Sequence, residues 1–332
     1  IFSLRVARVH GKPEKWGETK YERFLEKGIE AYIWLGRYLL NLRYLDEIYV
    51  DSKIAILEQR LVDDPQWQIF MEGYLFSAHL PKNVYSLIWS NYLKALTNKN
   101  FDKRVDEKLV EHICIGYLYY DEPLQEKKEN GQISLFWKML AEAAVFDKRY
   151  RWLRTAEFFW GMTSRRVRKD NVDKEEKPDE NIKKKILHFW AWTHNQREWV
   201  KGILADDYGE FLGDVARLTI LLDKIDEEKA EWLLLCAPYI ERNYQSTFFI
   251  EYLIQFEDPE TIKWIGKIYL KILEYATPTF QEENIQLLVD RIYKKGDWKD
   301  AETICDTYGR RGVHILKKVW ASNQKNQQER IV

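Results

Sequence analysis

The segment DPETIKWIGKIYLKILEY, residues 258–275, decides the fold class that this sequence predicts. Its apolar side chains recur at i, i+3, i+4, i+7 and i+8, and they are Ile265, Ile268, Tyr269, Ile272 and Leu273. This spacing places them on one face of an α-helix, because a helix repeats every 3.6 residues. Asp258 followed by Pro259 adds an N-cap residue and a proline at the first helical position. The segment is therefore typical of an amphipathic helix.

The same helical period extends along the chain, and no comparable run alternates strictly between apolar and polar residues. We therefore expect helices and no strands. Connections of two to six residues would make successive helices antiparallel. The expected helices lie near residues 18–46, 51–61, 65–79, 83–97, 104–120, 132–145, 150–163, 179–195, 197–206, 208–223, 227–241, 245–256, 259–275, 280–295, 298–308 and 312–322.

Local end signals support several of these boundaries. Thr279 with Glu282 three residues later is the pattern of a capping box. Gly296 and Gly309 lie where a helix commonly ends in a left-handed residue. We expect each of these residues to mark a helix terminus.

Two sequence features indicate helical repeats. The residues Phe-Asp-Lys-Arg at 101–104 recur at 146–149, a separation of 45 residues that falls within the HEAT and armadillo period. The segment GDWKDA, residues 296–301, resembles the turn between the helices of a tetratricopeptide repeat. We therefore expect an all-α fold, an α-solenoid of degenerate tetratricopeptide-like and HEAT-like antiparallel helical hairpins.

Residues 165–180 interrupt the helical pattern, because they contain few apolar side chains and include Pro178. They divide the chain into an N-terminal helical array at 1–164, a charged linker or loop at 165–180, and a C-terminal helical array at 181–332 with tetratricopeptide-like hairpins. The sequence leaves open whether the two arrays form separate domains or one bent superhelix.

The composition limits the classes of protein that the chain can represent. Hydrophobic residues make up 45% and charged residues 32% of the chain, enough apolar surface for a packed core. Basic and acidic residues number 52 and 53, whereas a dedicated nucleic-acid module usually has a clear basic excess. No stretch of 18 apolar residues predicts a membrane helix. Because the chain begins at Ile1 rather than Met, we expect it to be part of a larger protein.

The cysteines and histidines show no metal-ligand spacing. Cys114, Cys236 and Cys305 are far apart and lie in apolar helical segments, so we expect buried free thiols in a reducing cytoplasm. The six histidines are scattered along the chain at positions 10, 79, 112, 188, 194 and 314. We expect no metal site and no cofactor.

No motif predicts a catalytic residue. The chain lacks the phosphate-binding pattern G-x-x-x-x-G-K-[ST], the nucleophile pattern G-x-S-x-G and the zinc pattern H-E-x-x-H. The acidic pairs Asp63-Asp64 and Asp206-Asp207 lie at expected helix boundaries, so we interpret them as caps rather than as acid–base or metal-binding pairs. We expect the isolated chain not to be an enzyme. An enzyme with an unrecognised helical active site stays open as a third class.

Basic side chains flank the expected linker and form the candidate interaction patch. We name this set the linker-flanking basic patch, and its members are Arg165, Arg166, Arg168, Lys169, Lys183, Lys184 and Lys185. Such a patch can bind phosphates or an acidic partner. The simpler interpretation is cationic charge that complements a helix C-terminus, beside interleaved acidic residues that weaken the field.

Several segments carry a family resemblance. They are DPQWQIFMEGYLF at 64–76, EHICIGYL at 111–118, APY at 237–239, FFIEYL at 248–253 and YKKG at 293–296. Together they resemble the C-terminal helical-repeat regions of large bacterial anti-phage defence proteins, of the kind that follow SIR2-type or STAND-NTPase effector modules. The resemblance implies a helical array that recognises a phage or self protein or holds an assembly inactive, while a separate domain performs the chemistry. None of the effector motifs lies in this chain.

The sequence therefore predicts a cytoplasmic, non-catalytic scaffold that binds a protein partner and that oligomerises, if at all, through its parent protein. The alternative is a helical scaffold that binds nucleic acid through the linker-flanking basic patch.

Overall fold

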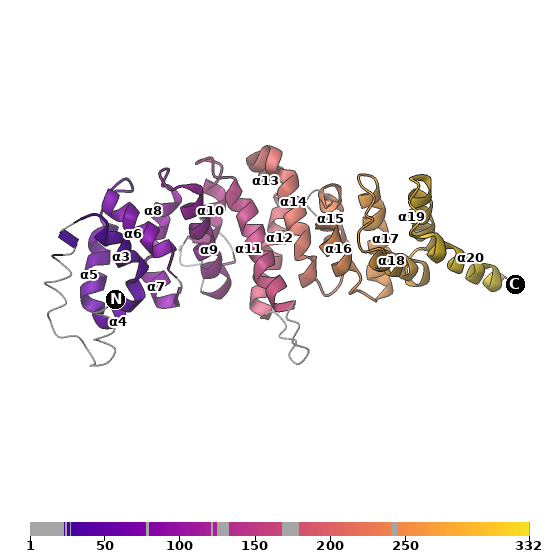
Figure 1. The fold of residues 1–332 in the computed structure, drawn as a ribbon, viewed down its shortest axis with the longest axis horizontal. Helices are drawn as coiled ribbons and strands as arrows, with labels where there is room; N and C mark the ends of the chain where they lie inside the picture. The colour runs from indigo at the N-terminus through magenta and orange to yellow at the C-terminus, as the bar shows by residue number, and fades with distance from the viewer. Residues whose placement is uncertain are drawn as a thin grey trace. The chain divides into compact units, whose positions relative to one another are not determined.

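The computed structural model describes residues 23, 25–26, 28–77, 80–120, 122–124, 133–167, 179–240 and 245–331, with only the backbone described at 164–167, 245–248 and 326–331. Within these residues the protein is all-α and contains no β-strand, which confirms the predicted class (Figure 1). The chain divides into two compact units, Ile1–Thr155 and Ala156–Val332.

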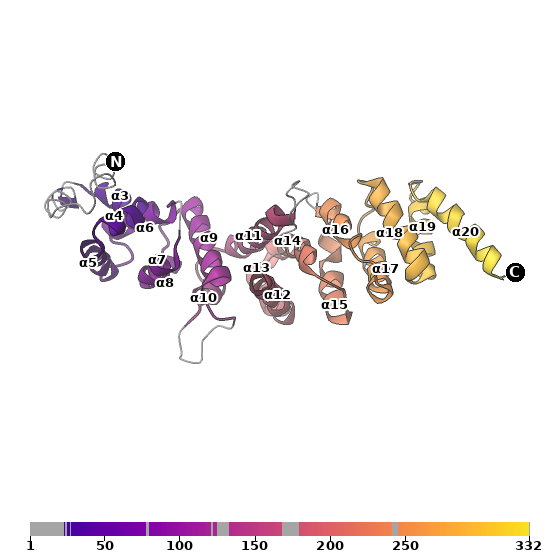
Figure 2. The same ribbon diagram turned by 90° about the horizontal axis from the view of Figure 1, so that it is seen from below.

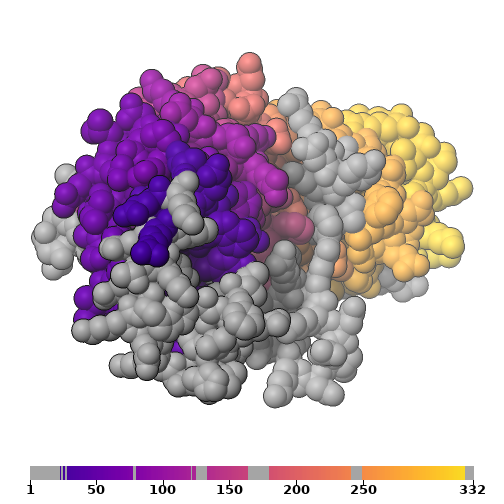
Figure 3. Space-filling model, turned by 60° about the vertical axis from the view of Figure 1, so that its left-hand side comes forward, coloured from indigo at the N-terminus to yellow at the C-terminus, as the bar shows by residue number. Residues whose placement is uncertain are grey.

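The first unit contains α3 (Ala31–Arg37), α4 (Leu39–Leu45), α5 (Glu47–Glu58), α6 (Pro65–Leu75), α7 (Lys82–Leu87), α8 (Trp89–Leu96), α9 (Lys103–Tyr119) and α10 (Leu135–Glu142). Helix α11 (Tyr150–Val167) begins in the first unit and ends in the second. In the space-filling view of Figure 3, the described atoms of the first unit are drawn in indigo to purple.

The second unit continues with α12 (Glu180–Asn195), α13 (Arg197–Leu204), α14 (Tyr208–Ala216), α15 (Glu227–Cys236), α16 (Gln245–Leu253), α17 (Pro259–Leu273), α18 (Glu282–Lys295), α19 (Trp298–Arg310) and α20 (Lys317–Ile331). Three 3₁₀ helices lie between them, at Ala205–Asp207, Arg217–Leu221 and Ala237–Tyr239. From α17 to α20, each helix contacts the next along the chain, and α17 and α18 also contact the helix after that (Figure 2).

The largest difference from the predicted helices lies near the N-terminus. Instead of one helix over 18–46, the described residues contain α3 and α4, which are separated at Tyr38 and end before Asp46. Asp46 has extended backbone angles, and its carboxylate accepts a hydrogen bond from the Tyr49 N–H at 3.0 Å. This cap starts α5 directly, because an N-cap residue must leave the helical conformation.

Two of the predicted caps are confirmed. Asp64 accepts hydrogen bonds from the Gln66 and Trp67 amides, and Pro65 is the first residue of α6. Asp258 accepts from the Thr261 amide at 2.9 Å and starts α17. In both cases the cap and the amides that it binds lie within four consecutive residues, so neighbouring helices do not alter the signal.

The other predicted helix ends are wrong in whole or in part. Helix α18 begins at Glu282 after Gln281, which has a left-handed φ of 57°, so Thr279 is not its cap. Asp207 precedes α14 without a side-chain capping bond. Gly296 ends α18 as predicted, although without the expected positive φ, whereas Gly309 lies inside α19 and does not end it.

The two Phe-Asp-Lys-Arg segments do not repeat in the structure. Asp102 is the N-cap of α9, where its side chain accepts from the Val105 amide at 2.8 Å. Asp147, its counterpart, has a left-handed φ of 52° between α10 and α11. The 45-residue spacing therefore does not mark equivalent positions of a repeat.

A buried charge cluster holds the first unit together. Asp106 is fully buried and accepts hydrogen bonds from Lys148 Nζ at 2.7 Å and from Arg151 Nε at 2.8 Å and Nη2 at 2.7 Å. Tyr150 donates a further hydrogen bond to it at 2.9 Å. Burial opposes ionisation of Asp106, but the two cations outweigh burial and hold its pKa below the ordinary value. The cluster joins the first turn of α9 to the start of α11.

His112 lies in a second polar group of the first unit. Its Nδ1 atom is 2.9 Å from the Tyr92 hydroxyl, which donates to the Tyr74 hydroxyl at 3.0 Å. The ring is 5% exposed, and burial lowers the pKa of His112 from 6.5 to about 4. His112 is therefore neutral in the folded protein near pH 7.

The first unit is expected to lose stability as the pH falls from about 6.5 to about 4. In this window the unfolded chain binds a proton at His112 and the folded chain does not, so acid favours unfolding. The loss attributable to His112 is roughly 2 kcal/mol by pH 5. Urea unfolding at pH 7 and pH 5 measures it as the difference between the wild type and His112→Gln.

The comparison with His112→Gln is needed because Asp214 in the second unit has the opposite effect. Burial raises the pKa of Asp214 to about 6, so its folded form binds the proton more tightly than the unfolded form. Its contribution therefore makes folding less favourable as the pH rises through the same window. An equal pH response in the wild type and His112→Gln would contradict the role assigned to His112.

Candidate binding groove between α19 and α20

The groove is built on the turn between α18 and α19. Gly296 ends α18, and Asp297 caps α19 by accepting a hydrogen bond from the Lys299 amide at 2.9 Å. Trp298 is 41% exposed, whereas Ala301 is fully buried in the close approach to neighbouring helices. These four positions have the local geometry predicted for a tetratricopeptide-like turn.

The other end of α19 positions α20. Gly312 has a φ of 74°, a left-handed conformation that glycine adopts without strain. Its amide donates to the Gly309 carbonyl at 3.0 Å, and the Val313 amide donates to the Tyr308 carbonyl at 3.0 Å. This pair of hydrogen bonds is a Schellman motif, which ends α19 and redirects the chain. As a result, the last helix begins at Lys317, five residues later than predicted.

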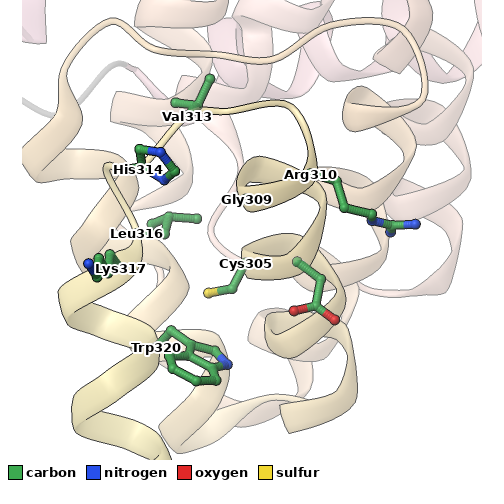
Figure 4. Close-up of a pocket in the computed structure, with 9 residues that line it drawn as sticks. Cys305, Gly309, Arg310, Val313, His314, Leu316, Lys317 and Trp320 are labelled. Carbon is green, nitrogen blue, oxygen red and sulfur yellow. The ribbon is translucent and has the colours of Figure 1, made fainter.

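A groove of about 570 Å³ lies between α19 and α20. In Figure 4, Cys305 and Leu316 point into the space between the two helices, and Trp320 extends from α20 toward α19. Its lining residues are Cys305, Asp306, Gly309, Arg310, Val313, His314, Leu316, Lys317 and Trp320. Leu316 and Cys305 are buried, while Trp320 is 42% exposed, so the floor is apolar and one wall is aromatic.

Basic side chains lie on both sides of this floor. Arg310 belongs to α19, Lys317 begins α20, and His314 lies on the segment between them. All three are exposed, and no side-chain hydrogen bond or ion pair joins them to another described residue. Asp306 is the single acidic residue among the lining residues. The groove therefore presents more positive than negative charge above an apolar floor.

Gly309 keeps the floor of the groove open. It lies inside α19 without a positive φ, and a Cβ atom built on it meets no heavy atom within 4 Å. Neither backbone conformation nor packing requires glycine here, although glycine in a helix costs about 1 kcal/mol relative to alanine. The effect of the missing side chain is free space at this point of the groove.

The structure describes only part of the linker-flanking basic patch. Arg165 and Arg166 lie in the last turn of α11, where the structure describes only the backbone. Arg168 and Lys169 lie outside the described residues. Glu180, at the end of the expected linker, is the first residue of α12.

The three lysines of this patch lie in α12 in different environments. Lys183 pairs with Asp223, with 2.6 Å between Nζ and Oδ2, and Lys185 is only 6% exposed. Lys184 is exposed. The run therefore does not present three free ammonium groups on one face of the helix.

The remaining chemistry in the described residues is consistent with packing. The three cysteines are free and buried, as predicted. Burial raises the pKa of Cys305 to about 11, so its thiol is protonated near neutral pH. No group of three or more histidine, cysteine, aspartate or glutamate side chains in the described part of the chain could hold a metal ion.

Comparison with known proteins gives no relative for this chain: no family model, curated protein or solved structure matches it. Among the helices that the structure describes, none is both long and apolar enough to cross a membrane.

Proposed function

We propose that this protein is a cytoplasmic α-solenoid that binds a protein partner and has no catalytic activity of its own. The contacts between successive helices from α17 to α20 support a stacked arrangement of hairpins. The tetratricopeptide-like turn between α18 and α19 supports it locally. Stacked hairpins display a long ordered surface on which a partner can bind.

Exposed aromatic and large apolar side chains in the second unit carry this proposal. They are Trp199, Tyr275, Phe280, Leu287, Trp298 and Trp320, and each is between 41% and 67% exposed. Tryptophan and tyrosine are common anchors of protein interfaces, because a rigid ring buries much surface at little entropic cost. Three of these rings, Trp199, Trp298 and Trp320, lie on helices, whereas Tyr275 and Phe280 lie in the connection between α17 and α18. The exposed part of each ring is accessible to a partner.

The biological setting that we propose is bacterial anti-phage defence. It rests on the resemblance of residues 64–76, 111–118 and 237–296 to the helical-repeat regions of defence proteins. In that setting the chain is the sensor or assembly region of a multidomain protein, and its partner is a phage or self protein. Deleting the region is then expected to abolish the response of the parent protein to phage.

The proposal is tested by site-specific photo-crosslinking in infected and uninfected bacterial cells. A benzophenone amino acid at Phe280 or Trp298 is expected to capture a discrete protein, because both side chains are exposed anchors. The matched controls carry it at Glu283 and Lys299, exposed polar positions nearby, and are expected to capture much less. Equal capture at all four positions, or none, contradicts the proposal.

Small-angle X-ray scattering tests the solenoid separately. A compact chain of 332 residues has a radius of gyration of about 20 Å, and a solenoid is expected to have a larger one.

A further inference from the structure

We infer that the groove between α19 and α20 binds an acidic peptide segment of a partner protein, with one apolar side chain of the peptide seated above Gly309. This inference rests on the proposed protein-binding function and assigns it a site and a ligand chemistry. The peptide's apolar side chain would contact Cys305, Leu316 and Trp320, which form the floor and wall of the groove.

The size and floor of the groove fit such a ligand. A volume of about 570 Å³ lies within the usual range of sites that enclose small ligands or a few side chains. Because Gly309 has no side chain and no heavy atom lies within 4 Å of its Cβ position, a ligand can approach α19 closely at this point. An apolar side chain placed there would replace water over the exposed part of Trp320, which favours binding.

The charges of the groove favour carboxylates on the ligand. His314 and Lys317 lie on the α20 side, where acidic residues beside the seated side chain can meet them, while Arg310 extends from α19 on the side away from α20 and adds positive charge at the edge of the groove. None of these three side chains has a partner among the described residues that it would have to give up. Opposite charges across an interface increase association rate and specificity.

Asp306 favours a peptide over a nucleic acid. Its carboxylate repels the phosphates of a nucleic-acid strand, whereas it can accept a hydrogen bond from a peptide N–H. Nucleic-acid grooves usually track the backbone with a continuous series of cations, and here an acidic side chain and an apolar floor interrupt that series.

The test is a selection from a displayed library of random ten-residue peptides on the full chain. Enriched peptides are expected to have net negative charge and at least one large apolar residue. Their binding is expected to weaken at least about tenfold in Gly309→Leu, whose side chain would fill the floor, and in the double variant Arg310→Glu, Lys317→Glu. Gly202→Leu is the matched control, because Gly202 is also helical with nothing within 4 Å of its Cβ position. Thermal unfolding of each variant separates loss of binding from loss of folding.

Each outcome decides the inference. It is overturned if no peptide is enriched, if the enriched peptides are basic or uncharged, or if they bind Gly309→Leu and Gly202→Leu equally well. Preferential binding of a single-stranded ten-nucleotide DNA over the enriched peptides would overturn it in favour of nucleic acid. If a partner is captured at Phe280 or Trp298 but binds Gly309→Leu as well as the wild type, the groove inference fails while the proposed function stands.

Discussion

Replacing Asp106 by alanine is expected to lower the free energy of unfolding by about 3–5 kcal/mol. The substitution removes the acceptor of hydrogen bonds from Lys148, Tyr150 and Arg151. Arg151 is fully buried and its Nη1 atom already lacks a partner, so the variant leaves an uncompensated guanidinium inside the first unit. Removing one partner of a buried pair is far more costly than removing the pair, because the remaining charge has no water around it. Urea unfolding followed by circular dichroism measures the loss.

The control for this prediction is Asp223→Ala. Asp223 also pairs with a lysine, Lys183, at 2.6 Å, but its side chain is 84% exposed. Surface ion pairs contribute about 0–1 kcal/mol, so this variant is expected to unfold almost as the wild type does. Equal losses in Asp106→Ala and Asp223→Ala would show that burial of the Asp106 cluster is unimportant.

The helices were predictable because their signals are local. Asp64-Pro65 and Asp258-Pro259 start α6 and α17 as predicted, since an N-cap needs only a side chain and the two or three amides that follow it. The termination of α19 was not predictable in the same way. Gly309 and Gly312 are both suitable end residues, and only Gly312 adopts the left-handed conformation.

The buried charge cluster was not predictable from the sequence. Lys148 and Asp106 are 42 residues apart, and charged residues in a chain with 32% charge are normally expected in solvent. Only the approach of α11 to the first turn of α9 brings them together. The environments of two lysines in the linker-flanking basic patch depend on packing in the same way, because α12 places Lys185 inside and Lys183 beside Asp223.

The candidate groove was not predictable either, because the sequence does not show where α19 ends. With a helix expected over 312–322, His314 and Trp320 would lie on one continuous helix. In the structure, the Schellman turn at Gly312 moves His314 off the helix and starts α20 at Lys317. The groove therefore depends on a backbone conformation that its lining residues do not reveal.

Replacing Gly73 by alanine is expected to destabilise the first unit by about 3 kcal/mol. Helices α3 and α6 cross closely, and a Cβ atom at Gly73 would lie 2.1 Å from the Ile33 carbonyl oxygen. The same crossing places a Cβ atom at Gly36 2.1 Å from the Phe70 carbonyl oxygen. Because these neighbours are backbone atoms, no side-chain rotation relieves the overlap, and the two helices must separate. That separation outweighs the gain of about 1 kcal/mol that alanine brings to a helix.

An exposed helical glycine, Gly202, provides the control for Gly73→Ala. Gly202 is exposed in α13 with nothing within 4 Å of its Cβ position, so Gly202→Ala is expected to stabilise the protein by up to about 1 kcal/mol. The two variants make the same chemical change in a helix and differ only in what the new methyl group meets. Urea unfolding of both should therefore give shifts of opposite sign. If Gly73→Ala also stabilises the protein, the close crossing of α3 and α6 is wrong.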